Sequence, residues 1–265
     1  MSKFGFWNVE KDKILYPRFG ASRPENLPEL NKNLGYEIVE RFEKTLEKFG
    51  DFDAIINGFF EITGKTSTCG SKKKTLKDLI EDSKKIGANF WQKGLKKGDK
   101  IHLLLSNSTE YHTFAIGAWL CEAIVSCGDP QASVQILKVQ IQDLNPKFII
   151  CYENSRNNLH QALIESEKSP QIIVLEKSCP NSNEDLPIFE NNFTFFHDFC
   201  QENLEKPPEL QDKKLENDEV FLILWTSGTT GIPKGTFINH MDIFSSILTI
   251  FWPLHTTSTP FLGHF

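Results

Sequence analysis

A ten-residue segment near the end of the chain combines glycine, hydroxyl and lysine residues at a spacing that suits phosphate chemistry. It reads Thr226-Ser227-Gly228-Thr229-Thr230-Gly231-Ile232-Pro233-Lys234-Gly235. Its three glycines let the backbone turn tightly and bring N–H groups close to a ligand. Its four hydroxyl groups are short, rotatable donors, and its lysine adds a compact positive charge. Together these groups predict a loop that holds a polyphosphate.

The segment has two other possible interpretations. The Walker A loop, G-x-x-x-x-G-K-(S/T), needs glycine before its lysine and a hydroxyl residue after it. Pro233 and Gly235 stand at those two positions. Segment 236–238 is β-branched or aromatic and predicts a strand after the loop, whereas a Walker loop leads into a helix. A plain polar hairpin between two strands is the second alternative, and the combination of all ten residues favours phosphate binding over it.

Before the loop, short apolar runs alternate with amphipathic segments. Strands are predicted at 101–105, 123–127, 148–152, 172–175 and 220–225, and helices at 34–49, 76–95, 109–122, 134–144 and 157–167. Asn33 and Gly50 mark the ends of the first helix, and Thr75 with Asp78 resembles a capping box at the start of the second. This alternation predicts an α/β fold class of mostly parallel strands with helices on both faces.

Composition divides the chain into four parts. Residues 1–50 form an N-terminal segment with an amphipathic helix, and residues 51–200 form an α/β subdomain. Residues 201–219, charged and containing two adjacent prolines, are predicted to be a surface linker. Residues 220–265 are then the start of a second, truncated subdomain that carries the phosphate-binding loop.

The loop and its surroundings resemble the adenylate-forming acid–CoA ligases, which include acyl-CoA synthetases, 4-coumarate–CoA ligases and beetle luciferases. Segment 226–235 is similar to the phosphate-loop signature of that family. Segments 94–108 and 115–144, and a helix start at His240, also fit the family pattern. The resemblance covers most of the chain, from about Phe52 to its end. It implies the incomplete large N-terminal domain of an adenylate-forming enzyme.

The resemblance implies an acid–thiol ligase that forms AMP. Such an enzyme uses ATP and Mg²⁺ to activate a small-molecule carboxylic acid as an acyl-adenylate, and then transfers the acyl group to coenzyme A. The residues implied to bind ATP are Thr226, Ser227, Gly228, Thr229, Thr230, Gly231, Lys234 and Gly235. The resemblance also implies that His240 and His264 lie near the acid substrate, although His264 stands one position later than the family spacing. Helix capping is the alternative role for His240.

Several motifs of the family have no counterpart in the sequence. They are its adenine and magnesium motif, its ribose-binding aspartate and the catalytic lysine of its smaller C-terminal domain. We therefore expect the catalytic residues to lie beyond Phe265, in a longer enzyme of which this chain is the N-terminal part. The alternative is a non-catalytic or degenerate protein of the same fold that binds nucleotide or acid without turnover.

Composition argues against several other classes of protein. The net charge of −6, from 29 basic and 35 acidic residues, disfavours a nucleic-acid partner, which requires a basic surface. No run approaches the roughly 20 apolar residues of a membrane span, and the N-terminus lacks the apolar core of a signal peptide. The six widely spaced cysteines are expected to be free thiols of an intracellular protein, either cytoplasmic or peroxisomal. Four histidines lack metal-ligand spacing and are predicted to be ordinary partly buried or surface residues: His102, His112, His160 and His197.

Overall fold

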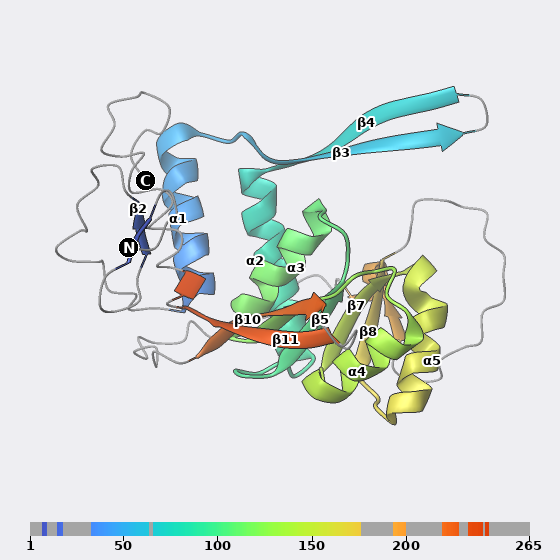
Figure 1. The fold of residues 1–265 in the computed structure, drawn as a ribbon. Helices are drawn as coiled ribbons and strands as arrows, with labels where there is room; N and C mark the ends of the chain where they lie inside the picture. The colour runs from blue at the N-terminus through green and yellow to red at the C-terminus, as the bar shows by residue number, and fades with distance from the viewer. Residues whose placement is uncertain are drawn as a thin grey trace.

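A seven-stranded sheet forms the centre of the computed structural model (Figure 1), which describes residues 7–9, 15–17, 33–63, 66–175, 193–199, 219–227, 233–240 and 242–243. Its strands are β5 (Lys100–Leu104), β6 (Ile124–Cys127), β7 (Phe148–Tyr152), β8 (Gln171–Leu175), β9 (Phe193–Phe195), β10 (Val220–Ser227) and β11 (Pro233–Asn239). Their order across the sheet is β11-β10-β6-β5-β7-β8-β9. Each neighbouring pair is parallel except β10 and β11, which are antiparallel.

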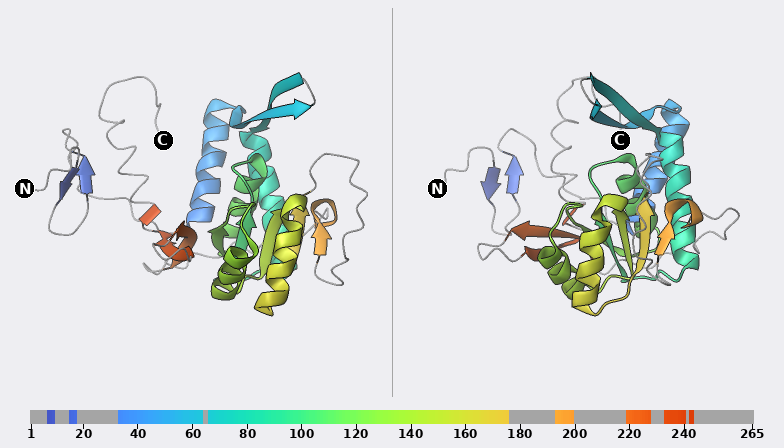
Figure 2. Two further views of the ribbon diagram at one scale, coloured as in Figure 1. Left: turned by 45° about the vertical axis from the view of Figure 1, so that its right-hand side comes forward. Right: turned by 90° about the vertical axis from the view of Figure 1, so that its right-hand side faces the viewer.

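Helices cover both faces of this sheet (Figures 1 and 2). The helices are α1 (Leu34–Phe49), α2 (Leu76–Gln92), α3 (Thr109–Trp119), α4 (Val134–Leu144), α5 (Arg156–Ser166) and the single turn α6 (Phe196–Phe199). Side chains of β7 alternate between the two layers, because Phe148 and Ile150 join the core under α2 and α3. Ile149 and Cys151 join the core under α4 and α5. The predicted α/β fold class, with a mostly parallel sheet between two helical layers, is confirmed.

The predicted helix caps are present, and two predicted helices end earlier than expected. The Asn33 side chain accepts a hydrogen bond from the N–H of Gly35 at 2.7 Å, and the Thr75 hydroxyl accepts one from the N–H of Asp78 at 3.1 Å. The helix predicted at 76–95 ends at Gln92, because Gly94 adopts a φ of +90°, which breaks the helical path. The helix predicted at 109–122 ends at Trp119 in the same way, before Glu122 at a φ of +56°.

Two antiparallel hairpins lie outside the predicted elements. The strands β3 (Asp53–Thr63) and β4 (Thr66–Thr75) form a long hairpin that projects away from the sheet between α1 and α2 (Figure 1). A shorter one pairs β1 (Trp7–Val9) with β2 (Leu15–Pro17). The sequence of β4 is mostly threonine, serine and lysine, so it lacks the apolar alternation by which a half-buried strand is recognised.

The strand expected to open a second subdomain, β10, pairs in parallel with β6 of the central sheet. Leu222, Ile223 and Leu224 lie opposite Val125, Ser126 and Cys127. The phosphate-loop hairpin is therefore built on the same sheet as the strands before it. The division of the chain into units at residues 200 and 219 stays a prediction.

The described part of the chain adds two further observations. Cys121, Cys127 and Cys151 are free thiols, and burial raises the pKa of Cys121 and of Cys151 to about 12, so both stay protonated. Cys179 and Cys200 lie outside the described residues. Among the described helices, none combines the length and the apolar character that crossing a membrane requires.

The contact between α2 and α3 is set by glycines. A methyl group on Gly117 would stand 2.7 Å from Cγ2 of Ile86 and 3.0 Å from the backbone nitrogen of Gly87. We predict that Gly117→Ala lowers the free energy of unfolding by about 1–2 kcal/mol, because overpacking outweighs the better helix propensity of alanine. Urea denaturation measures this change. Lys85→Ala, at an exposed position of α2, is the control and should change stability by less than about 0.5 kcal/mol. Equal stability of Gly117→Ala and the parent chain would contradict the packing argument.

Candidate functional site

The hairpin of β10 and β11 carries both ends of the predicted phosphate loop. Thr226 lies opposite Lys234, and Trp225 lies opposite Gly235. The strand predicted to follow the loop is present as β11, so the chain does not enter a helix as it would in a Walker loop. Gly228, Thr229, Thr230 and Gly231, at the centre of the loop, lie outside the described residues, as does His264.

The base of this loop presents polar groups to the surroundings. Both Thr226 and Lys234 are exposed, and the Thr226 hydroxyl donates a hydrogen bond to the carbonyl oxygen of Lys234 at 3.3 Å. Among the described residues, no hydrogen bond or ion pair engages the Lys234 ammonium group. An incoming anion can therefore reach this charge without displacing a described partner.

The described base of the loop lies beyond the carboxyl end of β6. Leu224 pairs with Cys127, the last residue of β6, so Trp225 and the residues after it run past the end of that strand. In open α/β sheets, ligands bind outside the carboxyl ends of the strands. The position of the hairpin therefore agrees with a ligand-binding role for the loop.

A row of four polar side chains, three of them buried, begins at Trp225 in the base of the loop. The Trp225 indole donates a hydrogen bond to the Ser126 hydroxyl at 2.9 Å, and Oγ of Ser126 lies 3.1 Å from Nδ1 of His102. Nε2 of His102 is 3.3 Å from Oε1 of Gln140 on α4. His102 and Ser126 are completely buried, and burial lowers the pKa of His102 to about 4. We call Trp225, Ser126, His102 and Gln140 the polar row. His102 is thus completely buried, whereas the prediction was a partly buried or surface histidine, and its partners were not foreseen.

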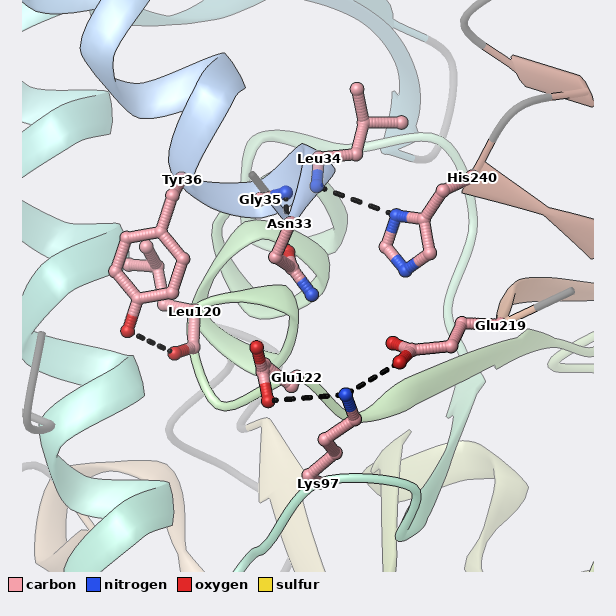
Figure 3. A network of polar contacts seen from close by, with 9 residues as sticks. All are labelled: Asn33, Leu34, Gly35, Tyr36, Lys97, Leu120, Glu122, Glu219 and His240. Atoms are coloured by element: carbon pink, nitrogen blue, oxygen red, sulfur yellow. Dashed lines mark hydrogen bonds and ion pairs between the residues drawn. The ribbon is translucent and has the colours of Figure 1, made fainter. Parts of the chain in front are cut away.

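His240 follows the other end of β11 and contacts the start of α1 (Figure 3). Its Nδ1 accepts a hydrogen bond from the N–H of Leu34 at 3.4 Å, beside the Asn33 cap, and its ring lies 4.7 Å from that of Phe221. His240 stands six positions after Lys234, which corresponds to about 20 Å along an extended strand. Through the hydrogen bond from Leu34, His240 caps the start of α1. The capping role predicted for it was at the start of the segment that His240 itself opens. Its role in binding the acid stays a prediction.

Charged residues surround this junction. The Lys97 ammonium lies 2.6 Å from the Glu219 carboxylate and 3.9 Å from that of Glu122 (Figure 3). Burial lowers the pKa of His240 to about 4, opposed by the charge of Glu219 and assisted by that of Lys97. A neutral imidazole is required here, because only an unprotonated Nδ1 can accept the hydrogen bond from Leu34.

The lowered pKa of His240 predicts a pH-dependent contribution to stability. An unfolded histidine takes up its proton near pH 6.5, whereas the folded His240 does so near pH 4. The unfolded state therefore binds more protons between these values, and stability falls as the pH falls from 6.5 towards 4. In His240→Asn, whose amide oxygen can replace Nδ1 as acceptor, this decline should be shallower than in the parent chain.

Unfolding curves in urea at pH 7 and pH 5 measure the effect. At pH 7, His240→Ala should be less stable than His240→Asn, because only the asparagine retains an acceptor for the N–H of Leu34. Parallel pH dependence in the parent chain and His240→Asn would exclude His240 as the titrating group.

Comparisons with known proteins give the family. The family model described as "AMP-binding enzyme" matches residues 42–262. The chain is 29% identical to 4-coumarate–CoA ligase 1 of Petroselinum crispum over 208 residues, which is 77% of this chain and 33% of that protein. It is 29% identical to acyl-CoA synthetase 7 of Caenorhabditis elegans, over 84% of this chain and 37% of that protein. The chain thus spans about a third of the length of the curated relatives that it matches.

Solved structures support the same fold. The luciferase-like enzyme of the nonluminescent mealworm Zophobas morio superposes with a TM-score of 0.61 at 22% identity, over 86% of this chain and 48% of that one. The A-PCP didomain of carboxylic acid reductase from Segniliparus rugosus, solved with AMP, gives 0.59 at 17% identity, over 77% of this chain and 32% of that one. The sequence match over most of the chain, together with this fold, shows that the chain belongs to the AMP-binding enzyme family.

Proposed function

We propose that this chain provides the phosphate-binding part of an acid–CoA ligase that forms AMP. The observation that carries the proposal is the β10–β11 hairpin, which holds an exposed Lys234 opposite Thr226 beyond the carboxyl edge of the sheet. The family and the names of its relatives support the reaction class. The substrate would be a small-molecule carboxylic acid. An intracellular location follows from the proposed co-substrates, ATP and coenzyme A, which are intracellular metabolites.

The proposed reaction makes a poor electrophile reactive in two steps. First, a carboxylate oxygen attacks the α-phosphate of ATP, which forms an acyl-adenylate and releases pyrophosphate. Second, the thiol of coenzyme A attacks the acyl carbon, which forms a thioester and releases AMP together with the thiol proton. Mg²⁺ would arrive with ATP, whose phosphate oxygens are typical ligands for this ion.

The loop would act in the first of these steps. Negative charge develops on the departing pyrophosphate, and donors that are already in place stabilise it without reorganisation. The proposed donors are the Lys234 ammonium, the backbone N–H groups of Gly228, Gly231 and Gly235, and the hydroxyls of Thr226, Ser227, Thr229 and Thr230. Thr226 and Lys234, opposite each other at the base of the hairpin, would stand on either side of the entering phosphates.

Acid-dependent exchange of pyrophosphate into ATP tests the proposal. The assay is run on the full natural polypeptide with a panel of aromatic and aliphatic carboxylic acids. Exchange that depends on an added acid would support the ligase, because it reports reversible adenylate formation. Tight binding of MgATP without any exchange would instead favour the non-catalytic alternative.

A substitution in the loop gives a quantitative prediction. A hydrogen bond to a charged group contributes about 1.5–3 kcal/mol, so Lys234→Ala should slow adenylate formation by roughly 10- to 150-fold. Stability should be unchanged, because Lys234 is exposed and bonds to no described side chain. Pyrophosphate exchange measures the rate, and urea denaturation measures the stability.

Lys44→Ala is the matched control for the loss of a positive charge. Lys44 lies on α1 and makes an exposed ion pair with Glu40, a kind of contact that contributes little to stability. This substitution should leave the rate of pyrophosphate exchange within about twofold of the parent rate. An unaltered rate in Lys234→Ala would remove the loop lysine from the mechanism.

A further inference from the structure

The polar row ties three strands and one helix together behind the phosphate loop. Its members come from β5 (His102), β6 (Ser126), β10 (Trp225) and α4 (Gln140), and Ser126 and Trp225 are 99 residues apart in the chain. His102, Ser126 and Gln140 have exposed fractions of 0%, 0% and 3%. Buried polar groups need partners, and each of these side chains has at least one within the row.

The chemistry of the indole sets the direction of one hydrogen bond in the row, and the tautomer of His102 sets the direction of the other two. An indole N–H can only donate, so the Ser126 oxygen accepts from Trp225. The remaining proton of Ser126 can be donated to Nδ1 of His102, 3.1 Å away, and the Ser126 backbone also contacts the imidazole. The imidazole proton then lies on Nε2 and is donated to Oε1 of Gln140. Burial keeps His102 neutral, with a pKa of about 4, so this arrangement persists at neutral pH.

The backbone makes room for the imidazole at one position. A methyl group on Gly128, the residue after β6, would lie 2.7 Å from Cε1 and 2.8 Å from Nε2 of His102. A side chain there would push His102 away from Gln140. Only glycine therefore accommodates the ring where the row needs it.

The row ends at the base of the phosphate loop. Trp225 immediately precedes Thr226 and lies opposite Gly235 in the β10–β11 register. A methyl group placed on Gly235 would stand 3.6 Å from two carbons of the Trp225 ring, so the ring covers this glycine at van der Waals distance. The orientation of the ring is thus coupled to the backbone on both sides of the loop.

We infer that Ser126, His102 and Gln140 are positioning residues that hold the Trp225 indole and thereby fix the base of the phosphate loop, an inference that rests on the proposed function. The row touches no substrate. It transmits the rigidity of the central sheet and of α4 to Trp225 and Gly235. Because small displacements of catalytic groups reduce rates strongly, loosening the row slows adenylate formation while leaving the binding of the acid unchanged.

Magnetic resonance of the ¹⁵N-labelled full chain tests the row without reference to activity. The imidazole nitrogens of His102 are assigned by comparison with His102→Gln. We expect the proton on Nε2, and an indole N–H of Trp225 that exchanges slowly with solvent. A proton on Nδ1 of His102 would overturn the inference, because Ser126 would then accept from both neighbours and the row would have no direction.

Hydrogen exchange of the backbone amides tests the coupling to the loop. In Ser126→Ala, the amides of β10 and β11 should exchange at least about tenfold faster than in the parent chain, because the indole loses its acceptor. Ser166→Ala is the matched control: its hydroxyl is also buried but bonds only to the carbonyl of Leu163 on α5. Equal rates in β10 and β11 for the two variants would overturn the inference.

Kinetics of pyrophosphate exchange separate positioning from a general loss of structure. Ser126→Ala should lower kcat about tenfold with an unchanged KM for the acid, and this loss should shrink to about twofold or less in the Lys234→Ala background. Additive losses in the double variant would contradict action through the loop.

If Ser126→Ala does not fold, Trp225→Phe serves instead, since it removes only the donor and retains a ring. A parent chain without exchange activity would refute the proposed function alone, because the resonance and amide-exchange measurements still decide on the row.

Discussion

The parallel pairing of β10 with β6 is the constraint on which the candidate site depends. A hairpin of two strands is marginally stable by itself, so β10 and β11 need this pairing to hold their shape. The register is set by burial, since Ile223 is 1% exposed and its partner across the strand pair, Ser126, is completely buried. A slip of one residue would turn Ile223 to the opposite face of the sheet and carry Trp225 away from Ser126. The direction of the loop and the integrity of the polar row thus depend on the same strand register.

The hairpin is held at both of its ends by different physical means. At the end away from the loop, Phe221 stacks on Trp119 at 4.1 Å, and the Trp119 indole donates to the carbonyl of Phe221 at 3.2 Å. His240 closes that end by accepting the N–H of Leu34 at the start of α1. At the loop end, the corresponding anchor is the bond from Trp225 to Ser126. The described strands of the hairpin are thus anchored at both ends.

Much of the fold follows from local pattern, and most of the site does not. Buried parallel strands and amphipathic crossover helices leave periodic signals, and caps such as Asn33 and Thr75 act on neighbours within three residues, so they could be predicted. The β3–β4 hairpin was missed because β4, composed mostly of threonine, serine and lysine, carries no such signal, although β3 is largely apolar. The strand–loop–strand form of the phosphate loop was predicted from its own residues. The polar row could not be predicted in this way, because His102 and Ser126 are 24 residues apart and each stands in an apolar run typical of a core strand.

In the candidate site, one set of residues is neutral and fixes the geometry, and a different residue carries the positive charge. A charged group in the polar row would have to be buried without a counterion, at a cost of several kcal/mol, whereas a neutral chain of directed hydrogen bonds satisfies each member. Burial of His102 enforces the neutral form. Lys234, in contrast, lies exposed at the mouth of the hairpin, where its charge is free to meet an anion. In the proposed site, neutral groups inside therefore fix the geometry, and a charged group outside is available to attract a polyphosphate.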